Sequence, residues 1–98
     1  MRRLEISRLA DADLDDILEY GTKIHGEAAA DAYYFSFQAA FDLLCRHPEA
    51  GQIDEETRLN LRRWHHQKHR IFYKHDATTL LIVRIFHHSV DLKSQFER

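Results

Sequence analysis

The sequence predicts an α+β domain in which an N-terminal strand and an antiparallel helical hairpin pack on a mainly antiparallel sheet (β-α-α-β-β-β), followed by a short C-terminal helix. Apolar residues first alternate with polar ones, then recur every three or four positions over residues 14–44, and finally form strand-like runs after residue 60. The chain has 98 residues, so we expect one domain over 1–98 with a single core.

The first segment, Arg3–Ser7, alternates Leu4 and Ile6 with polar residues, which is typical of a short, half-buried edge strand. A helix is predicted to follow, with Asp11 or Asp13 as its N-cap. Gly26 is predicted to end it. Its apolar stripe consists of Leu14, Ile17, Leu18 and Ile24. Gly21 falls on the same stripe, where it either allows another backbone to approach closely or marks a local bend.

A second helix is predicted after a connection of only a few residues, which favours antiparallel packing of the two helices. Pro48 is predicted to end this helix. Its stripe mixes small and large side chains: Ala29, Ala32, Tyr33, Phe37, Ala40, Phe41 and Leu44. Residues 46–60 are then expected to form a loop, with room for a short helical turn.

Three strand-like segments follow, at Leu61–His66, His69–His75 and Thr79–His88, and the breaks between them are short enough for hairpins. The third segment is apolar on both faces, so we predict a central strand that is covered on both sides. Asp91–Arg98 is predicted to form the C-terminal helix. Its two large apolar residues, Leu92 and Phe96, are spaced to fold back on the sheet.

Composition excludes several classes of protein. The chain is 44% hydrophobic and 11% aromatic, which is enough to build a core and argues against disorder. Its longest apolar run, Leu80–Val83, is too short to cross a membrane. The basic residues at the N-terminus are not followed by the apolar stretch of a signal peptide. The single cysteine, Cys45, cannot form an internal disulfide, so the expected location is the cytoplasm.

Charge is unevenly distributed, although the formal net charge is only −2. Residues 1–56 carry five basic and thirteen acidic side chains, whereas residues 57–98 carry nine basic and three acidic ones. Six of the eight histidines also lie in the second part. A basic surface of this kind suits a nucleic acid or an acidic protein. The two parts could equally attract each other within the fold.

The histidines do not predict a metal site, and we expect neither a metal nor a cofactor. The adjacent histidines at 65–66 and 87–88 lie on predicted strands, so each pair offers at most one ligand per face. No HExxH or CxxC spacing is present. No glycine-rich loop could hold a nucleotide.

Metal-free RNA cleavage needs an acid, a base and cations to stabilise the developing charge. The candidates for these roles, all on the predicted sheet, are Arg62, Lys68, Arg70, Lys74, Arg84, His87 and His88. In a regular strand, His88 shares a face with Arg84 and His87 lies on the opposite one. Arg84 could instead pair with a buried carboxylate and be purely structural.

Four segments, in order, carry a resemblance to one known family. They are residues 12–20 (ADLDDILEY), residues 48–51 (PEAG), Leu61-Arg62 with residues 69–74 (HRIFYK), and residues 82–91 (IVRIFHHSVD). In that order they resemble the first helix, the loop after the helical hairpin, the two following strands and the ending of the ParE toxins, which belong to the RelE/ParE superfamily of bacterial type II toxin–antitoxin systems. The resemblance covers nearly the whole chain.

The resemblance implies a toxin that inhibits DNA gyrase, is not an enzyme and is neutralised by a cognate antitoxin. That antitoxin would be ParD-like, with a ribbon-helix-helix domain and a disordered C-terminal tail. The toxin would reach DNA only indirectly, through the antitoxin. The residues that motif position assigns to target or antitoxin binding are Arg62, Tyr73, Arg84 and His87.

RelE-like members of the superfamily instead cut mRNA on the ribosome. A ribonuclease that uses Arg62, Arg84, His87 and His88 is therefore the alternative, and an inactive antitoxin-binding relative is another. The chain departs from the ribonuclease pattern in two ways. Its loop is acidic at residues 54–56, and Ser89 follows His88 where a tyrosine would be expected.

Overall fold

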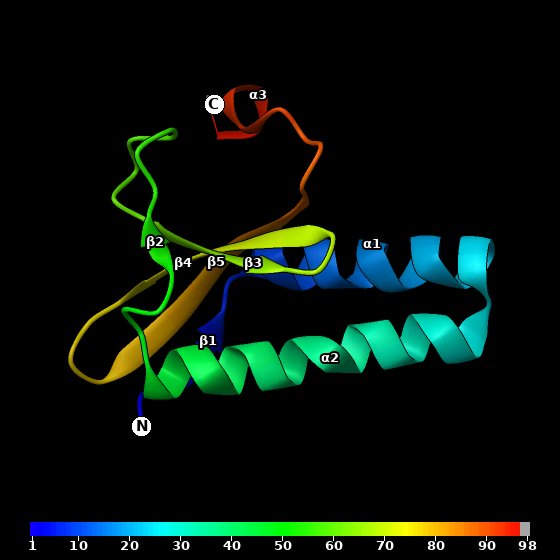
Figure 1. The fold of residues 1–98 in the computed structure, drawn as a ribbon, viewed down its shortest axis with the longest axis horizontal. Helices are drawn as coiled ribbons and strands as arrows, with labels where there is room; N and C mark the ends of the chain where they lie inside the picture. Colours follow the sequence, from blue (N-terminus) through cyan, green and yellow to red (C-terminus); the bar gives the residue numbers. More distant parts are fainter. Residues whose placement is uncertain (97–98) are drawn as a thin grey trace.

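The computed structural model describes residues 1–96 and confirms the predicted α+β fold. The elements in chain order are β1 (Arg3–Ile6), α1 (Arg8–His25), α2 (Glu27–Arg46), β2 (Gln52–Ile53), β3 (Arg62–His66), β4 (His69–His75), β5 (Thr79–His87) and α3 (Leu92–Phe96). The two long helices lie side by side along one side of the sheet, and α3 lies beyond its other side (Figure 1).

The sheet has five strands in the order β1-β5-β4-β3-β2. β1 pairs with β5 in parallel and is an edge strand, as predicted, whereas every other neighbouring pair is antiparallel. The loop predicted over residues 46–60 contains a strand that the pattern did not predict. This is β2, which pairs with β3 through Arg62 and Arg63. Two residues carry too little pattern to be recognised, and it is the pairing that defines them as a strand.

The core lies on both faces of the sheet, which confirms that β5 is covered on both sides. The larger cluster joins β4 and β5 to the helices through Leu14, Phe37, Phe41, Leu44, Ile71, Tyr73, Leu80, Ile82 and Ile85, among others. The smaller cluster, on the opposite face, contains Leu61, Phe72, Phe86 and Leu92. Phe96 packs its ring against Phe72 and Phe86 at centroid distances of 5.4 and 5.3 Å, so α3 folds back as predicted. Residues 97–98 of the predicted helix lie outside the described residues.

The helical hairpin extends beyond the sheet, so part of the predicted stripe is not buried (Figure 1). Ile24 is 57% exposed, and Ala29 and Ala32 are exposed as well. The buried alanine at this end is Ala30, whose Cβ would lie 3.2 Å from a Cβ added to Gly21. This contact confirms that Gly21 allows the two helices to approach closely.

The N-cap of α1 is Ser7, so the prediction of Asp11 or Asp13 is wrong. The Ser7 hydroxyl accepts the Ala10 N–H at 3.0 Å and donates to the Val83 carbonyl at 2.7 Å. Because one side chain both caps the helix and binds β5, the chain turns into α1 directly at the end of β1. Asp13 thereby falls inside the helix and is available for another contact. None of the described helices is long and apolar enough to span a bilayer.

Candidate functional site

Arg84 of β5 is bound to Asp13 of α1. Its Nε and Nη2 atoms both donate to the Asp13 carboxylate at 2.9 Å, and the Ile85 N–H donates to the same group at 2.9 Å. The exposed fractions of the two side chains are only 18% and 12%. β1 pairs with β5 only as far as Ile82, so Asp13 takes the place of a neighbouring strand along the next part of this edge. The structural alternative predicted for Arg84 is therefore the one that the contacts support.

A β-bulge in β5 determines which way the residues after it point. Phe72 pairs with Arg84 but the next residue of β4, Tyr73, pairs with Ile82, so Val83 is an extra residue. Arg84 then stacks on Phe86 at 4.4 Å from the ring centroid, on the α3 side of the sheet. His87 contacts His69 at a centroid distance of 5.4 Å and lines a groove beneath the helical hairpin. Arg84 and His87 thus lie on opposite faces.

Arg62 and Tyr73 are opposite each other on β3 and β4, and both hold the loop after α2. Arg62 Nη1 donates to the Gly51 carbonyl at 2.8 Å. The Tyr73 hydroxyl donates to the Pro48 carbonyl at 2.7 Å and accepts the Gly51 N–H at 2.9 Å. Burial raises the pKa of Tyr73, although its bond to Gly51 and the charge of Arg62 act in the opposite direction. Tyr73 is 0% exposed, so its side chain presents no surface to a partner.

A histidine cluster that the sequence did not predict lies between α2 and the β3–β4 hairpin. The Tyr33 hydroxyl lies 2.6 Å from His69 Nδ1, and the Ser36 hydroxyl lies 2.8 Å from His66 Nε2. Burial, assisted by His87 and His66, lowers the pKa of His69 to about 4. Burial also lowers the pKa values of His66 and His87. The available signal in the sequence was Ser36, a polar residue next to Phe37 in the largely apolar helix α2. Among the described residues, no group of three or more His, Cys, Asp or Glu side chains could hold a metal ion.

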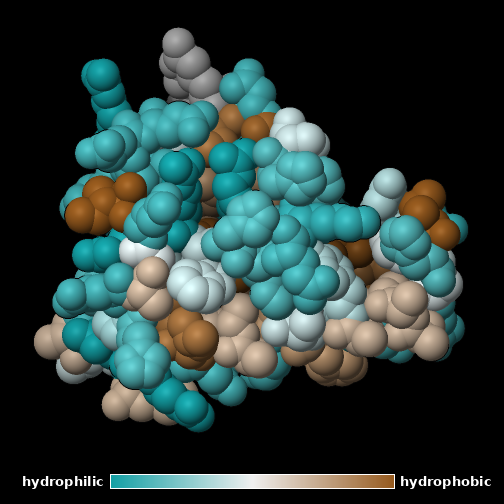
Figure 2. All heavy atoms as spheres, viewed as in Figure 1, coloured by the Kyte–Doolittle hydropathy of each residue, from teal (hydrophilic) through white to brown (hydrophobic). Residues whose placement is uncertain are grey.

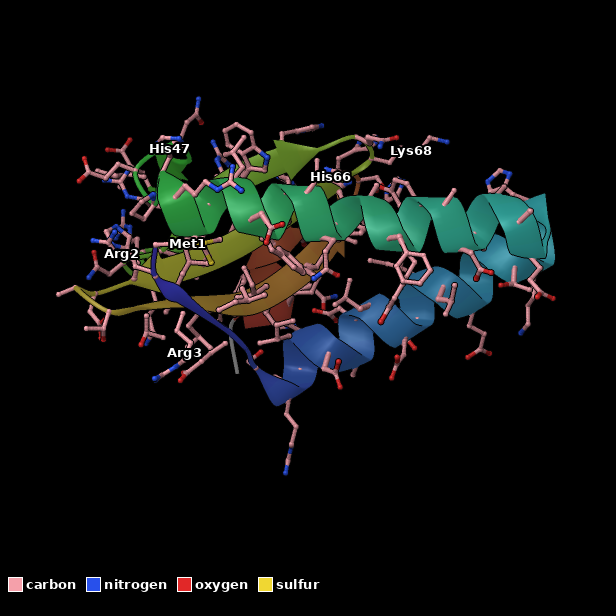
Figure 3. All side chains as sticks on the ribbon, turned by 90° about the horizontal axis from the view of Figure 1, so that it is seen from below. Met1, Arg2, Arg3, His47, His66 and Lys68 are labelled. Carbon is pink, nitrogen blue, oxygen red and sulfur yellow. The ribbon has the colours of Figure 1, made fainter. Side chains whose placement is uncertain are left out.

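The hairpin groove is a cavity of about 850 Å³ between the far half of α1 and α2 and the ends of β4 and β5. Its lining is apolar at Ile17, Tyr20 and Ile24, and the polar residues that also line it include Asp13, Asp16, Lys68 and His87. Hydrophobic atoms are recessed between the sheet and the far end of the hairpin (Figure 2). His66 and Lys68 lie beside α2 where the β3–β4 hairpin turns (Figure 3).

The structure brings together only some of the predicted site residues. Arg62 and Tyr73 meet at the loop after α2, and Arg84 lies apart from them with Asp13. His87 and His88 stack at a centroid distance of 4.4 Å, but His87 lines the hairpin groove and His88 lines a different cavity. Arg62, Arg84, His87 and His88 therefore do not converge on one reacting group. Whether any of them contacts a partner stays a prediction.

The sequence and the fold both match known toxins. A family model described as the ParE toxin of the type II toxin–antitoxin system parDE matches residues 4–92. Toxin ParE1 of Caulobacter vibrioides is 34% identical over 94 residues, covering 96% of this chain and 97% of that protein.

Two solved structures share the fold. One, described as the chromosomal ParDE system from P. aeruginosa, has a TM-score of 0.78 at 21% identity and covers 89% of this chain and 96% of that one. The other, the toxin–antitoxin complex RelBE2 from Mycobacterium tuberculosis, has a TM-score of 0.56 at 22% identity and covers 89% of this chain and 98% of that one. The match over residues 4–92 and the 34% identity to a ParE toxin confirm the resemblance, and the chain therefore belongs to the ParE toxin family of type II toxin–antitoxin systems.

Proposed function

We propose that this toxin inhibits DNA gyrase without breaking a covalent bond, and that a ParD-like antitoxin neutralises it. Membership of the ParE family supports the target. The observation that carries the non-enzymatic reading is the use already made of the basic side chains. Arg84 is paired with the Asp13 carboxylate, and His87 and His88 line two different cavities. A ribonuclease would need such cations free and close together to stabilise a transition state.

The four residues assigned to binding by motif position divide into two roles in this proposal. Tyr73 and Arg84 act indirectly, by fixing the loop after α2 and the end of β5. Arg62 and His87 retain exposed surface and are the two that we assign to contact with a partner. His87 lies on the wall of the hairpin groove, and Arg62 lies beside the loop at 48–51.

The hairpin groove is the surface that we assign to the antitoxin. Its lining is mainly apolar and carries both Asp16 and Lys68, which suits an amphipathic segment that orders as it binds. Tyr20 and Ile24 are 66% and 57% exposed at the same place. Large apolar side chains exposed beside a groove are typical of a surface that a partner covers. The antitoxin tail would supply apolar side chains to the groove and a carboxylate to Lys68.

Induced expression in a bacterium, with and without the antitoxin, tests the target. We expect growth arrest with a DNA-damage response, intact transcripts and rescue by the antitoxin. Transcript ends that map to cleavage within translated codons would contradict the proposal and favour a ribonuclease. Harmless expression without the antitoxin would contradict it in favour of an inactive relative.

A pair of matched variants tests the groove. Ile24→Arg places a charge in the groove, whereas Leu9→Arg makes the same kind of change at a 60% exposed residue of α1 that does not line it. We expect Ile24→Arg to stay toxic but escape neutralisation, and Leu9→Arg to be neutralised normally. Normal neutralisation of both variants would refute the assignment of the groove.

A further inference from the structure

A second cavity, of about 630 Å³, lies at the end of the sheet formed by β2, β3 and β4. The basic pocket, as we call it, is lined by Arg63 and His65 of β3, Arg70 of β4 and His88, which follows β5. Arg63 pairs with Phe72 and His65 pairs with Arg70, so these side chains share the face of the sheet away from the helical hairpin. The pocket is therefore separate from the hairpin groove.

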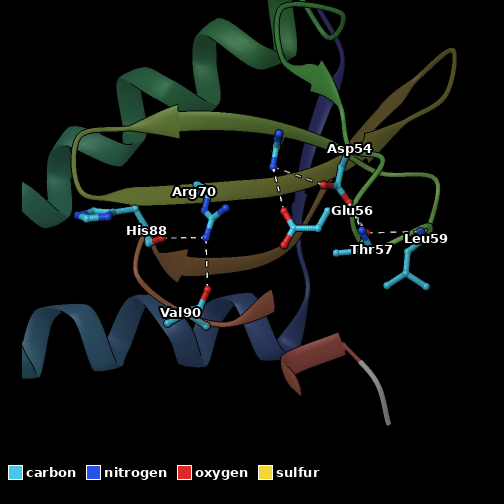
Figure 4. A network of polar contacts seen from close by, with 8 residues as sticks. Asp54, Glu56, Thr57, Leu59, Arg70, His88 and Val90 are labelled. Carbon is cyan, nitrogen blue, oxygen red and sulfur yellow. Dashed lines mark hydrogen bonds and ion pairs between the residues drawn. The ribbon is translucent and has the colours of Figure 1, made fainter. Parts of the chain in front are cut away.

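Arg70 of the basic pocket has no carboxylate partner among the described residues. Arg70 Nη2 donates to the carbonyls of His88 at 2.9 Å and Val90 at 3.4 Å (Figure 4). Its Nε is buried without a hydrogen bond among the described residues, and none of their carboxylates forms an ion pair with it. Arg84 differs, because Asp13 binds two of its nitrogens at 2.9 Å. Within residues 1–96, Arg70 thus keeps a charge whose hydrogen-bond partners are neutral carbonyls.

Arg63 is only loosely paired. Its Nη1 lies 3.7 Å from Asp54 Oδ1 and 3.6 Å from Glu56 Oε1, which is too far for hydrogen bonds (Figure 4). Asp54 instead accepts the N–H and the hydroxyl of Thr57, and its Oδ1 has no hydrogen-bond partner. A stronger acceptor in the pocket could therefore engage Arg63 without breaking a hydrogen bond.

The arrangement of these groups favours a phosphate. Donors from β3, β4 and the turn after β5 converge on one cavity, and none of its lining residues is acidic. A backbone phosphodiester carries one negative charge on two non-bridging oxygens, and further phosphates follow it along the strand, so several cations can be engaged at once.

We propose that the basic pocket binds a phosphate of a nucleic-acid backbone, so that the toxin contacts nucleic acid directly. This goes beyond the proposed function, which needs only gyrase and an antitoxin, and it departs from the expectation that DNA is reached only through the antitoxin. A direct contact would place the toxin against the DNA that its target holds. Arg63 and Arg70 would grip the phosphate with charge-assisted hydrogen bonds, and His65 and His88 would complete the donor set.

Fluorescence anisotropy of a labelled short oligonucleotide, single-stranded or duplex, tests the proposal with the purified chain alone. Affinity is expected to fall as salt rises from about 50 to 200 mM. Arg70→Gln is expected to weaken binding about tenfold and to reduce the slope of log K against log salt by about one. Lys23→Gln removes the same charge from an exposed residue of α1 and should leave binding within about twofold.

Arg70 also holds the turn after β5, so circular dichroism must show that its variant is folded. His65→Gln changes an exposed residue of the pocket and keeps the test decisive if Arg70→Gln does not fold.

Absence of binding by the unmodified protein at low salt would overturn the proposal, as would equal losses in the pocket variants and Lys23→Gln. Displacement of the oligonucleotide by equimolar inorganic phosphate would overturn the proposal in favour of a site for free phosphate. Stronger displacement by a glutamate-rich peptide would overturn the proposal in favour of an acidic protein. Because neither gyrase nor antitoxin is present, these outcomes are independent of the proposed function.

Discussion

Replacing Asp13 with alanine is expected to destabilise the toxin more than replacing any of its exposed acidic residues. Asp13 accepts two hydrogen bonds from Arg84 and one from the Ile85 N–H, and all three are 2.9 Å long. The variant would leave the Arg84 guanidinium and the Ile85 N–H without their acceptor. Water compensates this loss poorly, because only 18% of the Arg84 side chain and 12% of the Asp13 side chain are exposed. Breaking a fully buried pair costs about 3–5 kcal/mol. Partial access of water to Arg84 puts our expectation at the lower end, about 3 kcal/mol.

Urea denaturation followed by circular dichroism measures this loss directly. A loss of about 3 kcal/mol corresponds to a fall in Tm of roughly 12–24 °C for a domain of this size. Asp15→Ala is the matched control, because Asp15 is exposed on the same helix, and it should cost less than about 0.5 kcal/mol. Adding Arg84→Met to Asp13→Ala should recover part of the loss, since it removes the unpaired charge.

A small and equal effect of Asp13→Ala and Asp15→Ala would refute this reasoning. It would mean that Arg84 does not depend on Asp13 and is available to a partner. A double variant less stable than Asp13→Ala alone would show that the cost comes from lost packing and has no contribution from the uncompensated charge.

Three further outcomes are expected. Tyr73→Phe removes the hydroxyl that bridges Pro48 and Gly51 and should lower the free energy of unfolding by about 1–3 kcal/mol, whereas Tyr20→Phe, at a 66% exposed residue, should not. Gly51→Ala places a Cβ 2.6 Å from the Tyr73 hydroxyl oxygen and 2.7 Å from the Arg63 carbonyl, so it should cost about 1–3 kcal/mol in the same assay. His69 has a folded-state pKa of about 4, below its unfolded value, so the folded protein binds fewer protons and its stability should fall as pH decreases from about 6.5 toward 4. His69→Gln should flatten that dependence in part, leaving the contributions of His66 and His87; an unchanged slope would contradict the burial of a neutral His69.

Most of the fold was predictable because the apolar residues that are regularly spaced along each element are, for the most part, the ones that the structure buries. The contact of Gly21 with Ala30 and the return of Phe96 onto the sheet both follow from such spacing. The errors occur where an interaction between distant segments decides the outcome. Asp13 resembles an N-cap locally, but the cap is Ser7, and the Asp13 carboxylate is used by Arg84, 71 positions away. Ile24 has the right spacing for burial but lies beyond the end of the sheet.

The candidate site was less predictable for the same reason. Motif position identified Tyr73 and Arg84, but their contacts depend on the loop after α2 and on a bulge at Val83 that no local pattern reveals. The contact of Tyr33 with His69 and the basic pocket around Arg70 arise only when strands and helices are placed in register. Residue type indicated which side chains could bind a partner or act in catalysis. The tertiary structure decides which of them are already occupied by contacts within the protein.

A gyrase supercoiling assay with purified components tests the central claim most directly, because it contains neither ribosomes nor mRNA. The proposal predicts that the toxin blocks supercoiling of relaxed plasmid or leaves gyrase-dependent DNA breaks, and that prior addition of its antitoxin restores full activity. Unimpaired supercoiling at toxin concentrations that arrest growth, together with cleavage of mRNA in a translating extract, would contradict it.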